Sequence, residues 1–545
     1  MNLEEVKFAL ERTIAIGMAL SSERDLEVLL EMIVTEARRL TGADGGTLFL
    51  LNAASRQLEW AIVQNETMGI SFGGKSDGHI DPEKFRPIAL DDAHGEPAIA
   101  NVASYVVHHP GAVQIDDVYD EHDAFDFEGP IRFDEQTGYR TLSMLVVPLL
   151  HFDGGVVGVL QLINARDALG QSVPFAHHQI ASTMALASQG AVAVKNAMLF
   201  KELEDQFEAF IRVIATAIDE KSPYTAGHVK RVVDVTMRIA RAIDRAEQGP
   251  YADVSFDDDA LKALKIAAWM HDIGKIATPE YVVDKATKLE TIFDRITIIE
   301  ERFAKLRAIL ERDALHARLA ALSRGEPIDL AQQDVTLEAL CAELEEELAF
   351  LRQCNQGSEF MSDAKLARLE EIAHSPYTSP VDGETYHKLT ANELENLAIR
   401  KGTLTHEEIE IIRDHARISY VMLQKLPFGR HLKDVPEIAA GHHEKLNGKG
   451  YPRGLTAEEL SLPARILAVA DIFEALTARD RPYKRPSPLS MVDRILGFMV
   501  KDGELDPELV EFARRSGVLD AYARDEVSAE QCDFCFVEGS AIAKN

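Results

Sequence analysis

Five histidines and two aspartates in the C-terminal part of the chain form a pattern that suits metal binding. They are His228, the pair His271–Asp272, His415, the pair His442–His443 and Asp471. Neighbouring residues on a helix point in different directions, so each adjacent pair can offer one ligand to one cation and a second ligand to another. Imidazole and carboxylate ligands together favour iron, manganese or zinc over calcium. The pattern therefore predicts a site for two divalent metal ions.

Basic residues follow several of these positions, although the whole chain is acidic. Lys275 lies three residues after Asp272 and shares its face if the segment is helical, and Arg231 lies three residues after His228. A further basic group follows Asp471: Arg479, Arg481, Lys484 and Arg485. Positive charge beside metal ligands indicates an anionic, phosphorylated substrate. The alternative is that these residues are solvated helix ends.

Two cations held close together would support hydrolysis of a phosphodiester. They lower the pKa of a water molecule, which becomes the nucleophile, and they stabilise the charge that develops on the phosphate. Lys275 would stabilise the charge on the non-bridging oxygens. For the general acid that protonates the leaving ribose oxygen, the sequence offers no candidate.

The composition is that of a multidomain globular protein in a reducing compartment. The chain has 545 residues, which at about 150 residues per domain corresponds to three or four units. Four cysteines are too few for a disulfide framework, and no secretion signal or transmembrane segment is evident, so we expect a cytoplasmic protein. The formal net charge of −32 disfavours nucleic-acid polymers and membrane surfaces as partners.

The N-terminal part is predicted to contain one helix followed by strands. Apolar residues recur at helical spacing over 22–40, with a capping pattern of Ser22 and Asp25 at the start and Gly42 after the end. β-like stretches follow: 47–51, 58–63, 145–150 and 156–164, the last two joined by a turn at 153–155. This order predicts an α+β domain.

The same part of the chain resembles a GAF domain over roughly residues 20–175. The resemblance is carried by residues 133–164, with Thr137-Gly138-Tyr139, the strand that contains Pro148, and the strand 157–164. GAF domains sense small molecules or redox state, so the resemblance implies a small-molecule ligand, whose identity is unknown. His178-Gln179 stands where cyclic-nucleotide-binding members carry an acidic pair, which is a departure from that subgroup. The alternative is a GAF fold used for dimerisation alone.

A long linker helix is expected over residues 176–220. Apolar residues step by four and three: Ile180, Met184, Ala187, Ala191, Val194 and Met198, then Leu199, Leu203, Phe207, Ile211, Ile214 and Ile218 on a shifted face. We expect a signalling coiled coil that joins sensor to effector in a homodimer. The alternative is that the second half packs on the following domain.

The region of the histidines resembles an HD-GYP domain. The resemblance is carried by 271–275 (HDIGK), Gly450-Tyr451-Pro452, 462–471 and 481–484, in that order. It covers about residues 207–290 and 400–500. The family folds as an all-helical bundle with metals in its core, and it hydrolyses cyclic di-GMP to linear pGpG and often to GMP.

The resemblance implies roles for individual residues. The implied metal ligands are His228, His271, Asp272, His415, His442, His443 and Asp471. They would hold two divalent ions, iron or manganese, with Asp272 as the bridge and with Asp272 and Lys275 as the catalytic residues. The predicted substrate-binding residues are Arg231, Gly450, Tyr451, Pro452, Arg481 and Lys484.

Three further positions refine this assignment. Glu444 is expected to orient an imidazole. Tyr224 stands where members with a third metal carry a glutamate, which favours two metals here. Glu474 stands where many members carry an aspartate, so the charge is kept but the reach is longer.

The predicted architecture is multidomain. It comprises an α+β GAF domain over 1–175, a linker helix over 176–220, an all-α HD-GYP bundle in two parts over 221–288 and 405–520, a helical insertion over 289–404, and a tail over 521–545. Two periodic apolar stretches, Ile292–Leu310 and Leu337–Leu351, with a break at 325–327, predict that the insertion is a helical hairpin. It could dock a partner, extend the dimer or gate the site; the alternative is a passive decoration. Cys532 and Cys535 in the tail have ligand-like spacing, but they lack a second cysteine pair, and free thiols are favoured over zinc.

The predicted function is that of a metal-dependent phosphodiesterase for cyclic di-GMP, modulated by the GAF domain. Two alternatives stay open: a phosphodiesterase for cyclic GMP-AMP or another phosphoester, and a receptor that binds a cyclic dinucleotide without hydrolysing it. Because every expected ligand position of a two-metal site is filled, the sequence favours the enzyme.

Overall fold

The computed structural model describes residues 15–75, 78, 80, 81, 83, 85–120, 124–221, 227–358, 360–479 and 486–537. The chain divides into two compact units, Met1–Phe207 and Glu208–Asn545. The expected linker helix is α5, His177–Asp219, which begins in the first unit and ends in the second. None of the described helices has an apolar stretch long enough to cross a lipid bilayer.

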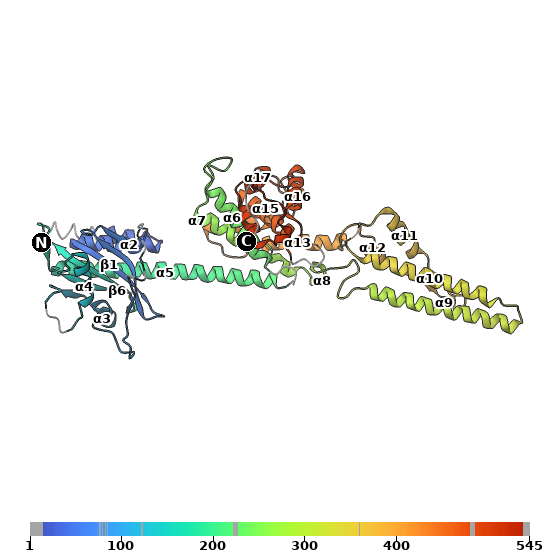
Figure 1. The fold of residues 1–545 in the computed structure, drawn as a ribbon, viewed down its shortest axis with the longest axis horizontal. Coiled ribbons are helices and arrows are strands. Elements are labelled where there is room, and N and C mark those ends of the chain that lie inside the picture. Colours follow the sequence, from blue (N-terminus) through green and yellow to red (C-terminus); the bar gives the residue numbers. More distant parts are fainter. Residues whose placement is uncertain are drawn as a thin grey trace. The chain divides into compact units, whose positions relative to one another are not determined.

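The first unit is built on an antiparallel sheet with helices on both faces (Figure 1). Its strands are β1 (Ala43–Asn52), β2 (Gln57–Asn65), β3 (Ile70–Phe72), β4 (Ile88–Ala89), β5 (Val113–Ile115), β6 (Met144–Leu150), β7 (Val156–Arg166) and β8 (Ser172–Val173). The order is β3-β2-β1-β7-β6-β5, with β4 on β2 and β8 on β7. The predicted hairpin is β6–β7, in which Val147 pairs with Leu160. The α+β prediction is confirmed.

Helix α2 (Leu26–Thr41) begins later than the sequence pattern suggested. The Asp25 carboxylate accepts hydrogen bonds from the amides of Glu27 and Val28, so Asp25 is the N-cap. Ser22 instead ends the preceding helical stretch, and its hydroxyl donates to the carbonyl of Ala19. The predicted capping pattern of Ser22 with Asp25 was therefore wrong, because a second helix occupies the residues before Asp25.

Each face of the sheet has its own apolar core. On one face, Leu29 and Ile33 of α2 pack with Ala187 and Ala191 of α5. The opposite face is covered by α3 (Val102–His108) and α4 (Glu128–Thr137), and Val106 is buried there. The first half of α5 is thus part of the core of the first unit, which explains why its predicted apolar face is buried.

The histidines and aspartates predicted to bind metal lie in a helical bundle in the second unit. Its elements are α6 (His228–Asp244), α7 (Asp258–Met270), η1 (Ile273–Ala277), α8 (Glu280–Val283), α13 (His406–Leu423), η2 (Arg430–Leu432), α14 (Val435–Ala440), η3 (Gly441–His443), α15 (Leu462–Thr477), α16 (Leu489–Lys501), α17 (Pro507–Arg515), α18 (Val518–Glu526) and η4 (Ala529–Gln531). Ile239, Leu264, Ile466 and Phe473 are fully buried in it. The described part of the bundle is helical throughout, as predicted.

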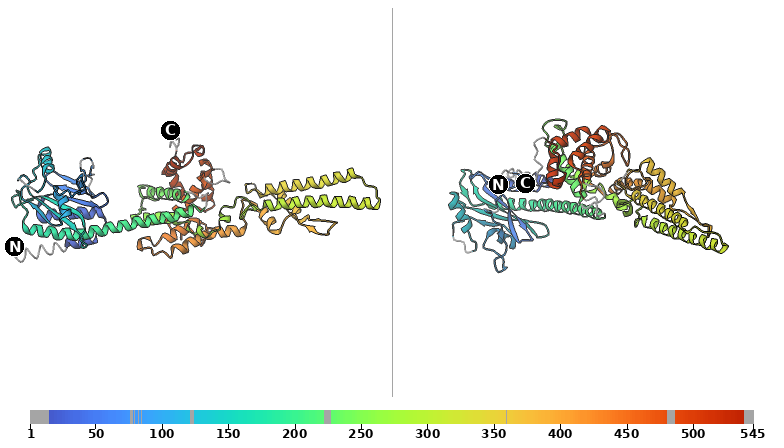
Figure 2. Two further views of the ribbon diagram at one scale, coloured as in Figure 1. Left: turned by 90° about the horizontal axis from the view of Figure 1, so that it is seen from below. Right: turned by 45° about the vertical axis from the view of Figure 1, so that its right-hand side comes forward.

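The insertion contains the predicted helical hairpin, formed by α9 (Ile296–Arg324) and α10 (Leu330–Asn355), which lie side by side (Figure 2). Short elements follow: α11 (Asp363–His374), β9 (Tyr377–Thr378), β10 (Thr385–Tyr386) and α12 (Ala391–Leu397). Ile299, Phe303 and Leu351 belong to a core of the insertion itself. Ile292, which the pattern included, is 94% exposed and precedes α9, so that part of the prediction was wrong.

Two buried lysines attach the insertion to the bundle. Lys285 Nζ donates to Glu408 Oε2 (2.8 Å) and to Asn396 Oδ1 (3.0 Å). Lys288 Nζ donates to the carbonyls of Leu397 (3.1 Å) and Ile399 (2.6 Å), and burial lowers the pKa of Lys288. Hydrogen bonds therefore join the segment that enters the insertion to the segment that leaves it.

Candidate metal centre

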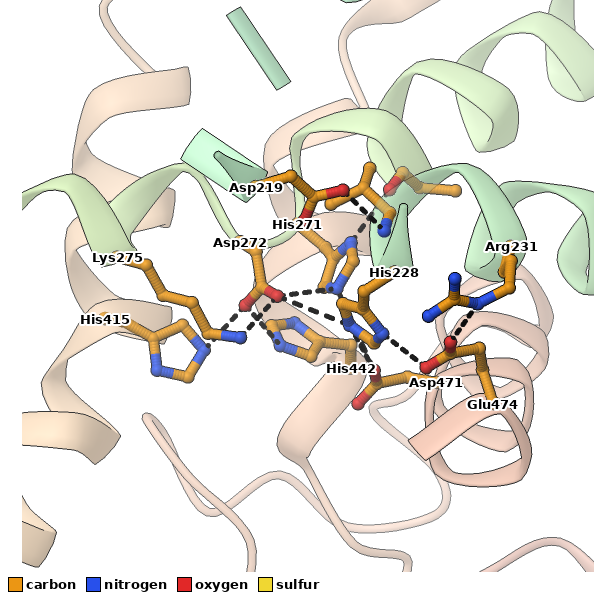
Figure 3. Close-up of polar contacts among 12 residues, drawn as sticks. Asp219, His228, Arg231, His271, Asp272, Lys275, His415, His442, Asp471 and Glu474 are labelled. Carbon is orange, nitrogen blue, oxygen red and sulfur yellow. Dashed lines mark hydrogen bonds and ion pairs between the residues drawn. The ribbon is translucent and has the colours of Figure 1, made fainter. Parts of the chain in front are cut away.

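Six of the predicted ligands converge in the middle of the helical bundle (Figure 3). They come from α6 (His228), the α7–η1 junction (His271 and Asp272), α13 (His415), η3 (His442) and α15 (Asp471). All six are buried. The α7–η1 segment is not one continuous α-helix, yet Lys275 Nζ still lies 2.6 Å from Asp272 Oδ2.

Asp272 lies between two groups of imidazoles. Its Oδ2 is 3.2 Å from His271 Nε2 and 3.6 Å from His228 Nε2. Its Oδ1 is 3.2 Å from His415 Nε2 and 4.0 Å from His442 Nε2. The two carboxylate oxygens therefore face different histidines, which is the arrangement that a bridging ligand needs.

The other two ligands complete these groups. Asp471 Oδ1 is 3.3 Å from His228 Nε2 and 3.9 Å from His271 Nε2, on the Oδ2 side of Asp272. His443 is half-buried, and its ligand atom lies within 4.8 Å of those of His415 and His442. The structure thus brings together all seven predicted metal ligands in two adjoining sets.

Three of the imidazoles are held in the form that binds a metal. In His271, His415 and His442, Nδ1 lies within hydrogen-bond distance of the backbone carbonyl three residues earlier. These carbonyls belong to Ala268 (2.8 Å), Ile412 (2.6 Å) and Ala439 (2.6 Å). Because a carbonyl can only accept, each Nδ1 carries a proton, so each imidazole in its neutral form offers the lone pair of Nε2. The three Nε2 atoms are buried, and no described group makes a hydrogen bond to them.

These donor atoms fit divalent metal ions. A neutral Nε2 and a carboxylate oxygen both offer electron pairs, so the 3.2 Å separations around Asp272 are unfavourable unless a proton or a metal ion lies between the atoms. Two neighbouring ligands at about 2.1 Å from one ion lie about 3 Å apart, close to the separations found here. Nitrogen and carboxylate donors together suit borderline transition metals.

The site combines an ionised carboxylate with imidazoles whose pKa values are shifted in opposite directions. Burial opposes ionisation of Asp272, but neighbouring ammonium and imidazole groups outweigh it and hold the pKa of Asp272 well below its usual value. Burial lowers the pKa of His442 far below its usual value and that of His443 to about 4, so both are neutral at pH 7. Burial also opposes charge on His228, but its carboxylate neighbours outweigh burial and raise its pKa. Burial likewise opposes charge on His271, but the carboxylates of Asp272 and Asp471 outweigh it and raise the pKa of His271.

Glu474 orients His228, a role that the sequence did not reveal. It is fully buried, its Oε2 is hydrogen-bonded to His228 Nδ1, and its Oε1 accepts from Arg231 Nε at 2.6 Å. Figure 3 shows Arg231 and Glu474 on the side of His228 away from Asp272. The longer side chain of glutamate therefore reaches His228 and Arg231. Arg231, which was predicted to bind substrate, contacts Glu474 in the structure.

Ser419 is a second residue that sequence reasoning missed. Its hydroxyl donates to the carbonyl of His271 (2.7 Å) and accepts from the amide of Gly274 (2.9 Å). A Cβ at position 274 would lie 2.0 Å from the carbonyl oxygen of His415. The glycine and the serine together let α13 approach the α7–η1 junction closely enough for His415 to reach Asp272.

The loop that contains Gly450, Tyr451 and Pro452 lies beside His443. The Tyr451 ring is 4.7 Å from the His443 ring, centroid to centroid, and the Tyr451 amide donates to the His443 carbonyl. Position 450 has no room for a side chain, since a Cβ there would lie 2.5 Å from the Cα of Glu444. The loop therefore borders the second set of ligands.

Glu444 does not orient an imidazole, so that expectation was wrong. Its two carboxylate oxygens accept from the amides of Arg453 (2.7 Å) and Leu455 (2.9 Å), and the residue is buried. Its side chain turns toward the loop because the loop offers two otherwise unpaired amides. Glu444 thus fixes the shape of the loop that follows Tyr451.

Some predicted positions lie outside the described residues or outside the site. Arg481, Lys484 and Tyr224 belong to the stretches that are not described. Cys532 and Cys535 belong to no metal-binding group among the described residues, and Cys532 Sγ donates to the carbonyl of Ser528.

Comparisons with known proteins identify the domains. A GAF domain model matches residues 25–194, and two HD domain models match residues 225–348 and 391–509. The solved structure of a GAF domain/HD domain protein from Geobacter sulfurreducens aligns with 33% of this chain and 98% of that chain, with a TM-score of 0.23 and 18% identity.

Curated relatives match about a quarter of this chain. The cyclic di-GMP phosphodiesterase of Thermotoga maritima is 37% identical over 137 residues, which cover 24% of this chain and 36% of the relative. The 3'3'-cGAMP-specific phosphodiesterase 1 of Vibrio cholerae is 38% identical over 122 residues, which cover 22% of this chain and 27% of the relative. This chain therefore spans about a third of the length of the first relative and about a quarter of the second.

Proposed function

We propose that this chain, which joins a GAF domain to an HD domain, is a metal-dependent phosphodiesterase that hydrolyses cyclic di-GMP to linear pGpG. The relatives named above support the substrate class. The observation that carries the proposal is the convergence of three buried, unpaired Nε2 atoms on the two oxygens of Asp272. Such a set of electron-pair donors is costly to bury unless protons or metal ions lie between them, and a metal centre gives it a role.

The residues present would hold two divalent ions, iron or manganese. His228, His271 and Asp471 would hold one, the three remaining histidines would hold the other, and Asp272 would be shared. Bound there, the ions would activate water and stabilise charge on the scissile phosphate.

The chain's own residues supply orientation and charge. Lys275, whose side chain is partly exposed, is held against Asp272 and can place its ammonium beside a non-bridging phosphate oxygen. The Tyr451 ring and the amides fixed by Glu444 shape one border of the site. Gly450, Tyr451 and Pro452, with Arg481 and Lys484, are our candidates for substrate binding. Arg231 acts in this proposal by holding Glu474, and through it His228.

A cyclic GMP-AMP phosphodiesterase is the second candidate. It is favoured by the Vibrio relative, which matches at 38% identity and whose own substrate is 3'3'-cGAMP. The candidate metal ligands do not distinguish the two dinucleotides, because the ions that they would hold would act on phosphates, which both dinucleotides have.

The test compares both dinucleotides in one metal-loaded preparation. We expect linear product from cyclic di-GMP at a higher kcat/KM than from cyclic GMP-AMP; the reverse order would select the second candidate. Asp272→Asn should abolish turnover and metal loading. The matched control is Asp414→Asn, since Asp414 is the neighbour of His415 but pairs with Arg417 away from the ligands. Full metal loading and tight binding without product would identify a receptor instead.

We also propose that the protein is a homodimer joined along α5. Four apolar residues of this helix, spaced by four, seven and three, are exposed: Leu199, Leu203, Phe210 and Val213. This spacing is that of a coiled-coil seam. Ile211 and Ile218 are buried instead, so the second half of α5 uses one face for its own unit and a second face for the partner. Leu203→Gln with Phe210→Gln should yield monomers in sedimentation; a wild-type monomer would refute the seam.

Two further parts of the proposal concern control and location. We propose that the GAF domain binds a small molecule and controls turnover through α5. We place the reaction in the cytoplasm, where the four free thiols remain reduced. Nucleic-acid polymers and membranes are not partners in this proposal because of the net charge of −32.

A further inference from the structure

The end of α5 is fixed to the bundle that holds the ligands. Ile211, Ala215 and Ile218 are buried within the second unit. The carboxylate of Glu208 accepts a hydrogen bond from Lys265 Nζ of α7 at 2.7 Å. A movement of the last turns of α5 therefore strains contacts with the bundle.

The last residue of α5 caps the helix that begins with His228. Asp219 is buried, and its Oδ2 accepts from the amide of Val229 at 3.1 Å. Gly227, the residue before α6, makes no side-chain cap of its own. Asp219, at the end of α5, thus caps the N-terminus of α6. The amide that it binds belongs to Val229, the residue after the candidate ligand His228.

Lys221, two residues later, holds the segment that carries Lys275. Its Nζ donates to the carbonyls of Lys275 (3.1 Å), Ile276 (2.9 Å) and Thr278 (2.7 Å). An ammonium has three protons, so all its hydrogen-bonding capacity is used on η1 and the residue after it. The Lys275 carbonyl also accepts from the Thr278 amide, so Lys221 reinforces the last turn of η1.

We propose that Asp219 and Lys221 are positioning residues that couple α5 to the metal site. Asp219 holds the start of α6, which carries His228, and Lys221 holds the end of η1, which carries Lys275. Two residues at or just after the end of α5 therefore contact the elements on two sides of the site. The same helix contributes Ala187 and Ala191 to the core of the first unit. A displacement of α5 relative to the bundle therefore changes the spacing between ligands. Misplacement by about 1 Å lowers turnover by roughly 100-fold.

The first experiment removes the ammonium of Lys221 in the full chain. Lys221→Met keeps the length of the side chain but donates no hydrogen bond, and Lys221→Arg restores a donor. Lys201→Met is the control, because Lys201 is exposed on α5. We measure amide hydrogen exchange over residues 273–278, manganese content, and kcat and KM with cyclic di-GMP. The activity readout rests on the proposed function, whereas the exchange readout does not.

The proposal predicts a localised effect. In Lys221→Met, the amides of Lys275 and Thr278 should exchange about 10-fold faster or more, kcat per bound metal should fall about 10- to 100-fold, and Lys221→Arg should recover most of the loss. Unchanged exchange and unchanged kcat would overturn it. Faster exchange throughout the bundle would also overturn it, since Lys221 would then contribute stability alone. If the wild type does not hydrolyse cyclic di-GMP but the local exchange effect is found, the proposed function fails and the positioning role stands.

The second experiment tests transmission along α5. Residues 201–206 are exposed, so one alanine inserted after Lys201 rotates the two parts of the helix relative to each other without changing a buried contact within one chain. Because the insertion also shifts the proposed dimer seam at Leu203, its effect is compared between backgrounds of equal oligomeric state, measured by sedimentation. We expect the insertion to change kcat in the wild-type background and to change it much less in Lys221→Met. Equal fold-changes in the two backgrounds would contradict coupling through Lys221.

Discussion

Replacing Gly274 by alanine would force apart two elements that carry metal ligands. The new Cβ would lie 2.0 Å from the carbonyl oxygen of His415 and 2.7 Å from the amide nitrogen of Ser419. Both neighbours are backbone atoms of α13, so neither can rotate away. Since real Cβ contacts are essentially never shorter than 3.0 Å, α13 and η1 must separate by about 1 Å or more.

The magnitude follows from this displacement. His415 Nε2 would move from 3.2 Å to beyond about 4 Å from Asp272 Oδ1, and the hydrogen bond from the Gly274 amide to Ser419 would be lost. We expect a loss of roughly 10- to 100-fold in metal affinity. Overpacking together with the lost hydrogen bond should lower the free energy of unfolding by about 2 to 4 kcal/mol.

The assay is manganese titration of the metal-free protein, with the denaturation midpoint measured in parallel. Gly497→Ala is the control: it lies in α16, and the nearest atom to its new Cβ is Arg514 Nη2 at 3.8 Å. The free energy of unfolding of that variant should rise by up to about 1 kcal/mol, because alanine favours a helix more than glycine does. If Gly274→Ala fails to fold, Ser419→Ala gives a milder version of the same test. Wild-type metal affinity in both Gly274→Ala and Ser419→Ala would refute the role given to this packing.

Three other predictions concern the surroundings of the ligands. Glu474→Gln should weaken manganese binding roughly 10- to 100-fold in a titration, because His228 loses a charged partner; unchanged affinity would remove Glu474 from the account. Burial raises the pKa of Asp219 to about 6, from 3.8 when unfolded, so the folded protein binds the extra proton and loses stability as the pH rises between these values. In metal-free protein, the free energy of unfolding of Asp219→Asn relative to wild type, measured by thermal unfolding, should therefore rise by about 1 to 3 kcal/mol from pH 4 to pH 7. A difference that stays constant over this range would contradict the raised pKa of Asp219. Manganese at 100 times the Kd of each site should stabilise the wild type by about 2.7 kcal/mol for each bound ion, and this gain should disappear with chelator and in Asp272→Asn, where a persisting gain would locate the metal elsewhere.

The convergence of the candidate metal ligands could be predicted because their chemistry is visible in single residues and adjacent pairs. His271–Asp272 and His442–His443 combine residue types that are costly to bury without a cation, so their pairing is informative on its own. The residues that hold the ligands carry no such signal. Ser419 lies 145 positions from Gly274, and Glu474 lies 246 positions from His228, so their contacts depend on how the helices pack.

The fold was predictable to a similar degree and for similar reasons. The hairpin of α9 and α10 was evident because long helices repeat their apolar spacing over many turns. Strands β9 and β10 have two residues each, too few for any periodicity, and they were missed. In α5 the periodicity was real, but it does not say which apolar face meets which neighbour: Ile211 is buried and Leu203 is exposed.

The central claim is that the convergent histidines and aspartates form a metal centre that cleaves a cyclic dinucleotide. The most direct measurement counts iron, manganese and zinc per chain in anaerobically purified protein and follows cyclic di-GMP in the same sample, with Asp272→Asn beside it. The account predicts two metals per chain and linear product for the wild type, and loss of both in the variant. A wild-type protein that retains no metal, or product that forms equally in Asp272→Asn, would contradict it.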